Sequence, residues 1–163
     1  MAARPPLSLK ARALQWLAQR EHSRVELRRK LLRAARQRDA LAGESDDAAD
    51  RAAQVDALLD WLTAERHLSE ARFVESRVHA RSRRFGNRRI VQELAQHGAA
   101  LDELTTERLK ASELGRARAI WQRKYGGAPA LDASTRAKQM RFLAGRGFCA
   151  EVIRKVVRAG DED

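Results

Sequence analysis

The sequence predicts an all-α protein built from tandem three-helix repeats, an elongated, curved and basic molecule of eight or nine helices. Three observations lead to this prediction. Alanine, arginine, leucine and glutamate dominate the 163 residues, whereas glycine and proline number only 9 and 3, a composition that favours helix throughout. Apolar residues recur at the spacing of one helix face. A basic corner between two helices also occurs three times, as in proteins whose repeats stack on their neighbours.

The first predicted repeat covers residues 8–67. Ser8 can cap its first helix. Ser23 and Glu26 have the spacing of a capping box at the start of the second helix, in which the two residues satisfy each other's free amide groups. The third helix should end near His67. It is predicted from apolar residues at i, i+3, i+4 and i+7 spacing, which are Val55, Leu58, Leu59 and Leu62.

An acidic stretch at residues 34–50 interrupts this repeat. Its five acids outweigh Arg36 and Arg38, which gives a local charge of −3, and Gly43 lies in its middle. We predict that the stretch is partly a flexible loop, mainly in its second half. Such a loop could shield the basic face of the protein while no partner is bound.

The second predicted repeat covers residues 68–110. Ser69 is a good cap for its first helix, and Gly98 is expected to end the helix that follows the basic corner. Leu101 and Leu104 then start another helical stretch.

The third predicted repeat covers residues 111–160, and an acidic tail at 161–163 follows it. Its first helix carries five apolar residues on one side, which are Leu114, Ala117, Ile120, Trp121 and Tyr125. A last pair of helices is expected at about residues 132–144 and 149–158.

The most basic stretch of the chain is the corner at residues 81–94. It reads as a helix end, a Gly86-Asn87 break and a second helix. The apolar side of the second helix consists of Ile90, Val91, Leu94 and Ala95. Five arginines against the single Glu93 give a local charge of +4. A polyanion could reach arginines on both sides of this corner.

Similar corners occur near both ends of the chain. Each copy has an arginine at the same place before the joint, and these residues are Arg20, Arg83 and Arg146. An apolar pair at i, i+4 spacing follows each joint, namely Leu27 and Leu31, Ile90 and Leu94, and Ile153 and Val157. Any two amphipathic helix pairs share apolar columns, so the arginine column is the stronger sign of an internal repeat.

The charge of the chain favours an acidic partner. Lys and Arg number 33 against 22 Asp and Glu, which gives a net charge of +11 and an isoelectric point near 11.0. Because the arginines cluster, we favour binding over the alternative that the charge only maintains solubility. No stretch approaches the ~20 apolar residues of a membrane span, and the single Cys149 cannot form an internal disulfide. We expect a cytoplasmic monomer that contacts no membrane.

We predict that the protein is not an enzyme and uses no cofactor. Its four histidines lack metal-ligand spacing to one another or to Cys149, and the chain has no GxxxxGK[ST] phosphate loop. Cys149 is expected to cap or pack at a helix N-terminus. Trp16, Trp61 and Trp121 lie on apolar helix faces, which is typical of a core position and not of a base-stacking platform.

Four segments of the chain resemble the RecX family of recombination regulators. They are residues 17–31 (LAQREHSRVELRRKL), 68–75 (LSEARFVE), 84–94 (RFGNRRIVQEL) and 140–148 (MRFLAGRGF). They follow the order of the family and span most of the chain between about Ala11 and Arg158. The family is similar in fold to the prediction above, with tandem three-helix units in a curved, basic molecule.

The resemblance implies that the protein binds the RecA recombinase filament along its helical groove. It would then modulate or inhibit ATP hydrolysis, strand exchange and repressor self-cleavage, which belong to DNA repair, homologous recombination and the SOS response. Single- and double-stranded DNA are expected as weaker, salt-sensitive partners. The alternative is a general helical DNA-binding protein that competes for DNA. Such electrostatic binding weakens steeply with salt, whereas a specific protein interface should weaken less.

The candidate contact residues are basic side chains at the three corners. The central corner supplies Arg83, Arg84, Arg88 and Arg89, for which the alternative is a solvated helix surface with pairs such as Arg89–Glu93. The other corners supply Arg20, Arg24, Arg28, Arg29, Arg146, Arg154 and Lys155. Guanidinium groups can hold phosphates or carboxylates through two hydrogen bonds. The sequence leaves open which residues contact protein and which contact DNA, and also the stoichiometry and the sign of the modulation.

Three features depart from the family pattern. The acidic stretch at 34–50 is longer, His97 replaces the usual lysine, and Cys149 stands where serine often caps a helix. None of them affects the arginine column.

Overall fold

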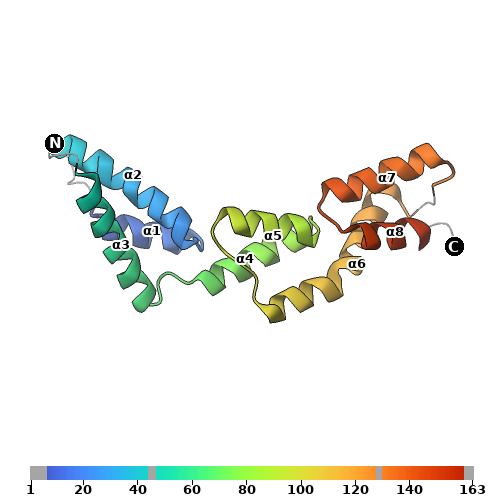
Figure 1. Cartoon of the computed structure of the whole chain (residues 1–163), viewed down its shortest axis with the longest axis horizontal. Coiled ribbons are helices and arrows are strands. Elements are labelled where there is room, and N and C mark those ends of the chain that lie inside the picture. Colours follow the sequence, from blue (N-terminus) through green and yellow to red (C-terminus); the bar gives the residue numbers. More distant parts are fainter. Residues whose placement is uncertain (1–6, 44–46, 128–129, 160–163) are drawn as a thin grey trace. The chain divides into compact units, whose positions relative to one another are not determined.

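A computed structural model describes residues 7–43, 47–127 and 130–159. Over these ranges the chain forms eight α-helices and no strand, which confirms the all-α prediction (Figure 1). The helices are α1 (Leu9–Gln19), α2 (Arg24–Ala42), α3 (Ala48–Ala64), α4 (Glu70–Ser82), α5 (Asn87–Gln96), α6 (Glu103–Tyr125), α7 (Ala133–Gly145) and α8 (Ala150–Ala159). None of the helices within the described ranges is long and apolar enough to cross a membrane.

The chain divides into two compact units. The first ends at Phe73 and the second begins at Val74, so the boundary falls inside α4. The first unit contains α1–α3, and the second contains α5–α8. Counted over the full sequence, the second unit has 19 Lys and Arg against 11 Asp and Glu, whereas the first has 14 against 11. Most of the excess positive charge therefore belongs to the second unit.

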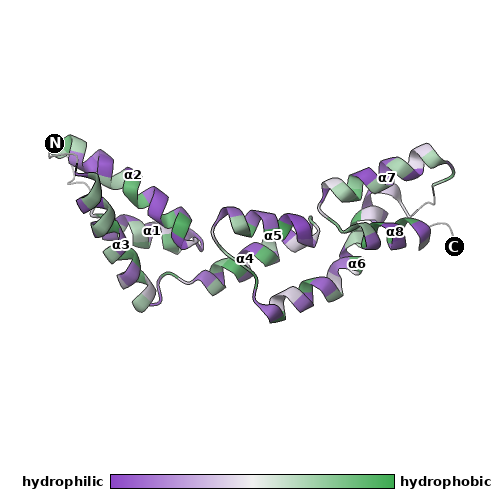
Figure 2. Cartoon of the chain, in the orientation of Figure 1, coloured by the Kyte–Doolittle hydropathy of each residue, from purple (hydrophilic) through white to green (hydrophobic). Residues whose placement is uncertain are grey.

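The core of the first unit lies between α1, α2 and α3. Hydrophobic and hydrophilic residues alternate along these helices, so each has one apolar side (Figure 2). The fully buried members of the core are Ala13, Leu27, Leu31, Ala35, Val55, Leu59 and Leu62. Burial of each leucine side chain contributes about 1.5–3 kcal/mol. The i, i+4 spacing predicted for α2 and α3 is thus the spacing that forms the core.

The core of the second unit lies between α6, α7 and α8. It consists of Ala117, Ile120, Trp121, Leu143, Phe148, Ile153, Val156 and Val157. Trp121 is buried, and its indole N–H donates to Gln139 Oε1 at 2.9 Å, which confirms a core position for this tryptophan. Trp16 and Trp61 are half-buried against the core of the first unit.

The serine caps predicted at the starts of three helices form. The hydroxyl oxygens of Ser8, Ser23 and Ser69 accept hydrogen bonds from backbone amides three residues on, at 3.1–3.3 Å. Gly98, with φ +67°, adopts the left-handed conformation just beyond α5 that glycine favours after a helix.

The structure changes the boundaries of two predicted segments. Within the described residues, the acidic stretch is helical up to Ala42 in α2 and again from Ala48 in α3, so the predicted loop is confined to residues 43–47. Gly43 ends α2 in the left-handed conformation, and the Asp47 carboxylate caps α3 by accepting from Ala49 N and Asp50 N. Residues 44–46 and the acidic tail at 161–163 lie outside the described ranges. The two stretches predicted around Leu104 and Leu114 are one continuous helix, α6.

An ion pair joins α2 to α3 from the two sides of the predicted loop. Asp39 Oδ2 accepts from Arg51 Nε at 2.8 Å, and its other oxygen accepts from Arg38 Nη2 at 2.8 Å. Arg51 and Asp39 are both buried, with 4% and 7% of their surface exposed. Two hydrogen bonds hold the pKa of Asp39 below its ordinary value, and the one from Arg51 has a larger effect than the one from Arg38.

We predict that Asp39→Asn lowers the unfolding midpoint at neutral pH by several degrees, because it removes the carboxylate charge that pairs with the buried Arg51. A lowered pKa stabilises the fold at pH values above the unfolded-state pKa of about 3.9. This stabilisation is lost as the pH falls through the lower folded-state value. The difference in midpoint between wild type and Asp39→Asn, measured by circular dichroism, should therefore shrink toward about pH 3. A difference that is constant with pH would contradict a role for the Asp39 charge.

Candidate functional site

The central basic corner is a helix break at residues 83–86. α4 ends at Ser82, and Gly86 stands at the N-cap position of α5 without a side chain to cap it. Asn87 N instead donates to Glu113 Oε1 on α6 at 3.0 Å. Only 5% of Glu113 is exposed, so a buried carboxylate from another helix caps α5.

Arg116 on α6 holds the two sides of the break together. Its guanidinium donates to the carbonyl oxygens of Ser82 at 3.2 Å, Phe85 at 2.8 Å and Leu109 at 3.2 Å. It also donates to Asn87 Oδ1. Burial lowers the pKa of this guanidinium, and the nearby Glu113 carboxylate acts in the opposite direction. Arg116 thus fixes the backbone from which the exposed arginines of the corner project.

The central corner packs directly on the third corner, between α7 and α8. Gly86 N donates to Arg146 O at 2.8 Å, and Arg88 N donates to Gly147 O at 3.1 Å. A Cβ on Gly86 would overlap the backbone of Gly147 and Phe148. Gly147 has φ +85°, and a Cβ there would lie 2.5 Å from Arg89 Cβ. Both glycines are therefore required for the close approach of the two corners.

This approach gathers four guanidinium groups around one aromatic ring. The distances from the guanidinium carbon to the Phe85 ring centroid are 4.7 Å for Arg89, 5.5 Å for Arg81 and 5.7 Å for both Arg84 and Arg146. We call these five residues the Phe85 cluster. Arg146 also donates from Nη1 to Arg84 O at 3.2 Å. Each cation contributes an attraction to the ring of about 0.5–1 kcal/mol at an exposed site.

Glu93 is the carboxylate that pairs with this cluster among the described residues. It accepts from Arg81 Nε at 2.7 Å and lies 3.6 Å from Arg89 Nε. The predicted Arg89–Glu93 pair is thus present, but one carboxylate faces four guanidinium groups. Arg83 and Arg88 are exposed beside the cluster, and no ion pair is found for either within the described residues. The corner therefore carries uncompensated positive charge that an anionic group can neutralise.

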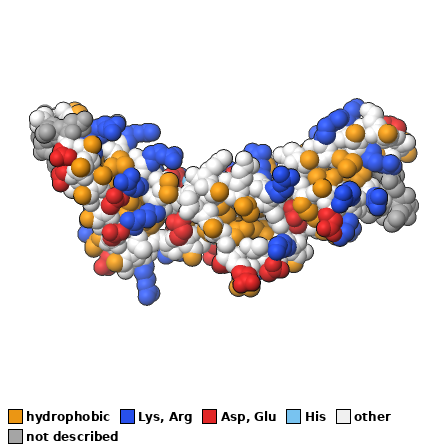
Figure 3. All heavy atoms as spheres, viewed as in Figure 1, with side chains coloured by type: hydrophobic (Ala, Val, Ile, Leu, Met, Phe, Trp, Pro, Cys, Tyr) orange, Lys and Arg blue, Asp and Glu red, His pale blue; other side chains and the backbone are white. Residues whose placement is uncertain are grey.

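The third-corner candidates separate in the structure. Arg146 belongs to the Phe85 cluster, whereas Arg154 and Lys155 are exposed on α8. Lys155 Nζ donates to Glu151 Oε1 at 2.6 Å. Several Lys and Arg side chains also lie on the visible surface around α7 and α8, around hydrophobic side chains (Figure 3).

The first-corner candidates are mostly paired with acids inside the first unit. Arg20 pairs with Glu26, and this hydrogen bond raises the pKa of Arg20. Arg24 Nη2 donates to Asp60 Oδ1 at 2.6 Å. Arg28 donates to both Asp56 oxygens, from Nε at 2.6 Å and from Nη2 at 3.0 Å. Arg29 is exposed, and no ion pair is found for it within the described residues.

We predict that the double variant Asp56→Asn, Asp60→Asn binds DNA about threefold more tightly than wild type at low salt, because it releases two arginines from internal pairs. Its stability should change little, since exposed ion pairs contribute little to folding. Fluorescence anisotropy with labelled single-stranded DNA measures the affinity. Asp47→Asn, Asp50→Asn, at the N-cap and in the first turn of the same helix, is the matched control, because it changes the charge equally without releasing Arg24 or Arg28. Equal affinities of the two double variants would contradict the prediction.

Sequence reasoning missed Arg116 and Glu113. Both lie on α6, 29 and 26 residues from the Asn87 atoms that they hold, and no local pattern indicates such a contact. Cys149 lies half-buried just before α8, where a capping or packing role was expected. Within the described ranges, no cluster of three or more His, Cys, Asp or Glu side chains has the arrangement of a metal site.

Two models of known protein families match the chain. The model described as RecX, second three-helix domain, matches residues 69–100, and the model described as RecX, third three-helix domain, matches residues 111–157. The first range contains the break at residues 83–86, and the second contains Arg116 and Gly147. Both corners of the Phe85 cluster thus lie within matched segments.

Relatives that match nearly the whole chain are named regulatory protein RecX. The regulatory protein RecX of Ralstonia nicotianae is 48% identical over 160 residues, which cover 97% of this chain and 91% of that protein. The regulatory protein RecX of Herminiimonas arsenicoxydans is 48% identical over 163 residues, covering 99% of this chain and 98% of that protein. The crystal structure of RecX from Lactobacillus salivarius is similar in fold, with a TM-score of 0.67, 16% identity and coverage of 95% of this chain and 96% of that one.

Proposed function

The chain belongs to the RecX family of regulatory proteins, and we propose that it binds the filament of the RecA recombinase along its groove and modulates or inhibits its ATPase, strand-exchange and coprotease activities. We propose that it does so as a monomer and a non-catalytic regulator. Its effect arises from binding, which restrains the subunit rearrangements that accompany ATP turnover.

The observation that carries this proposal is the Phe85 cluster. Four guanidinium groups share one carboxylate and lie on a backbone fixed by Arg116 and by two glycine contacts. A recombinase filament on DNA presents phosphates and carboxylates in a regular array. Arginine binds both groups through paired, charge-assisted hydrogen bonds. A rigid cluster of arginines loses less conformational entropy on binding than separate, mobile side chains would.

The basic residues do not contribute equally in this proposal. The central corner and Arg146 make the main anionic contacts, because their charge is largely uncompensated. Arg20, Arg24 and Arg28 already hold carboxylates and stabilise the first unit. Arg29, Arg154 and Lys155 are peripheral contacts. This division refines the sequence-based prediction, which favoured the central corner but did not separate the residues of the other two corners.

The alternative function is that of a DNA-binding protein that competes with the recombinase for DNA. The exposed charge of the second unit alone would support such binding. The two functions differ in their response to salt, since binding that depends on phosphates alone weakens steeply as salt rises. Apolar and hydrogen-bonded contacts with protein are less sensitive.

The test compares binding to a preformed recombinase filament with binding to the same single-stranded DNA without recombinase, as salt is raised. The proposal predicts tighter binding to the filament at every salt concentration and a shallower salt dependence. Equal affinities with equal salt dependence would favour the competitor.

A further inference from the structure

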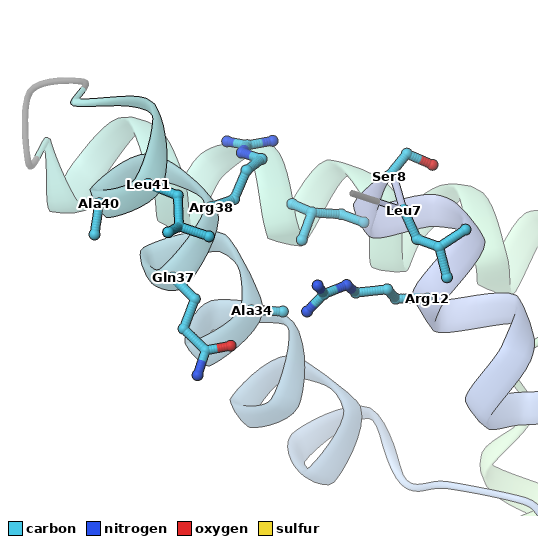
Figure 4. A pocket seen from close by; sticks show the side chains of 9 residues that line it. Leu7, Ser8, Arg12, Ala34, Gln37, Arg38, Ala40 and Leu41 are labelled. Carbon is cyan, nitrogen blue, oxygen red and sulfur yellow. The ribbon is translucent and has the colours of Figure 1, made fainter. Parts of the chain in front are cut away.

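The first unit has a surface feature that the Phe85 cluster, which lies in the second unit, does not explain. A groove lies between the start of α1 and the end of α2 (Figure 4). Its walls are mainly apolar, and their apolar members are Leu7, Leu9, Ala34, Ala40 and Leu41. Leu41 is 85% exposed and Leu7 is 51% exposed, so two large apolar side chains at one groove face solvent. Exposed apolar surface that gathers at one place is typical of an interaction site.

Arg12 is one of four polar residues that line this groove. It extends from α1 toward Ala34 on the opposite wall (Figure 4). Its side chain is half-buried, and no carboxylate pairs with it among the described residues. The other cation at the groove, Arg38, already donates to Asp39 from Nε and Nη2 at 3.0 and 2.8 Å. Arg12 therefore brings an uncompensated charge to an apolar surface.

Among the described residues, no acidic side chain lines the groove to balance Arg12. The nearby Asp39 carboxylate is held by Arg51 on α3 and by Arg38, and Asp39 is not among the lining residues. A charge that is partly desolvated gains more from a partner than one in bulk water, because screening by solvent is weaker there. The groove thus has two requirements, an anionic group for Arg12 and apolar side chains for Leu7 and Leu41.

We propose that this groove docks a segment of a protein partner in which a carboxylate lies next to an apolar side chain. The carboxylate pairs with Arg12, and the apolar side chain packs between Leu7 and Leu41. The charge complementarity identifies the occupant as acidic, and the apolar walls favour protein over nucleic acid, whose phosphates gain nothing from leucine side chains. The inference rests on the proposed function, since the partner that presents the segment is the recombinase filament.

This proposal assigns different tasks to the two units. The groove in the first unit contacts protein, and the Phe85 cluster in the second unit contacts anionic groups, including DNA phosphates. A variant of the groove should therefore weaken binding to the filament and leave binding to bare DNA unchanged. A variant of the Phe85 cluster should weaken both.

The experiment measures affinities of full-length variants for a preformed filament and for bare single-stranded DNA of the same length. The groove variants are Arg12→Glu and Leu41→Ser. The second replaces a side chain that is already 85% exposed, so it should fold even if Arg12→Glu does not. Arg36→Glu, which changes an exposed arginine of α2 outside the groove, is the matched control for net charge.

The expected result for Arg12→Glu is at least about a tenfold loss of affinity for the filament, the effect of one charge-assisted pair. Leu41→Ser should bind the filament about threefold more weakly than wild type. On bare DNA, Arg12→Glu should bind like its control Arg36→Glu, and Leu41→Ser should bind like wild type. If both groove variants bind the filament as tightly as their controls do, the groove proposal is overturned and the proposed function stays intact. If wild type binds the filament no more tightly than bare DNA, both the groove proposal and the proposed function are overturned.

Discussion

Gly147→Ala is expected to destabilise the second unit by about 3 kcal/mol. The left-handed backbone at φ +85° costs an L-residue about 1–2 kcal/mol, and the new Cβ would lie 2.5 Å from Arg89 Cβ and 2.8 Å from Arg89 N. The helix α5 would have to move away from the third corner to relieve this overlap. Because domains are stable by only about 5–15 kcal/mol, a loss of this size is readily measured by urea unfolding.

Gly115→Ala is the matched control for this prediction. Gly115 lies within α6, and a Cβ built on it meets no atom within 4 Å. This substitution should stabilise the protein by about 0.5–1 kcal/mol, because alanine is the better helix former. If Gly147→Ala were as stable as wild type, the close packing of the two corners would be contradicted.

The triple variant Arg84→Gln, Arg89→Gln, Arg146→Gln is expected to bind both DNA and the recombinase filament roughly 100-fold more weakly at low salt. It removes three of the four cations around Phe85 and leaves Arg81, which Glu93 already neutralises at 2.7 Å. The dependence of log affinity for single-stranded DNA on log salt should also become shallower by about 2, or about 0.7 for each lost phosphate contact.

The control for this variant neutralises three other exposed arginines of the second unit, Arg118, Arg123 and Arg141, to glutamine. It lowers the net charge equally but leaves the Phe85 cluster intact, so its affinity should fall by less than about tenfold. Fluorescence anisotropy over a range of salt concentrations measures both quantities. Equal losses in the two triple variants would mean that net charge, and not the arrangement around Phe85, determines binding.

Much of the fold could be predicted from local sequence. The i, i+4 spacing of Leu27 and Leu31 marks the core face of α2, and Ser23 caps that helix as its spacing with Glu26 indicates. These signals are local, because a helix face and a cap depend on residues within a few positions of one another. The acidic composition of residues 34–50 predicted a loop but could not show where α2 ends, because the pairing of Asp39 with Arg51 on the next helix is not a local signal.

The site could be predicted only in part. The density of arginines at residues 81–89 indicated an anion-binding corner, but sequence alone could not show that Arg146 joins it, because that contact joins residues 62 positions apart. The pairing of Arg24 with Asp60, across 36 positions, was hidden in the same way. Arginines that look equivalent in sequence therefore differ in the structure according to which carboxylates the fold brings beside them.

The central claim is that the protein acts on the filament and not on free DNA. DNA-dependent ATP hydrolysis by a preformed recombinase filament, titrated with this protein, tests it most directly. The paired variant changes four arginines of the central corner together to glutamate, namely Arg83, Arg84, Arg88 and Arg89. We predict inhibition by wild type well below one molecule per recombinase subunit, and none by the variant. Inhibition that begins only when the protein is sufficient to coat the free DNA would contradict the claim.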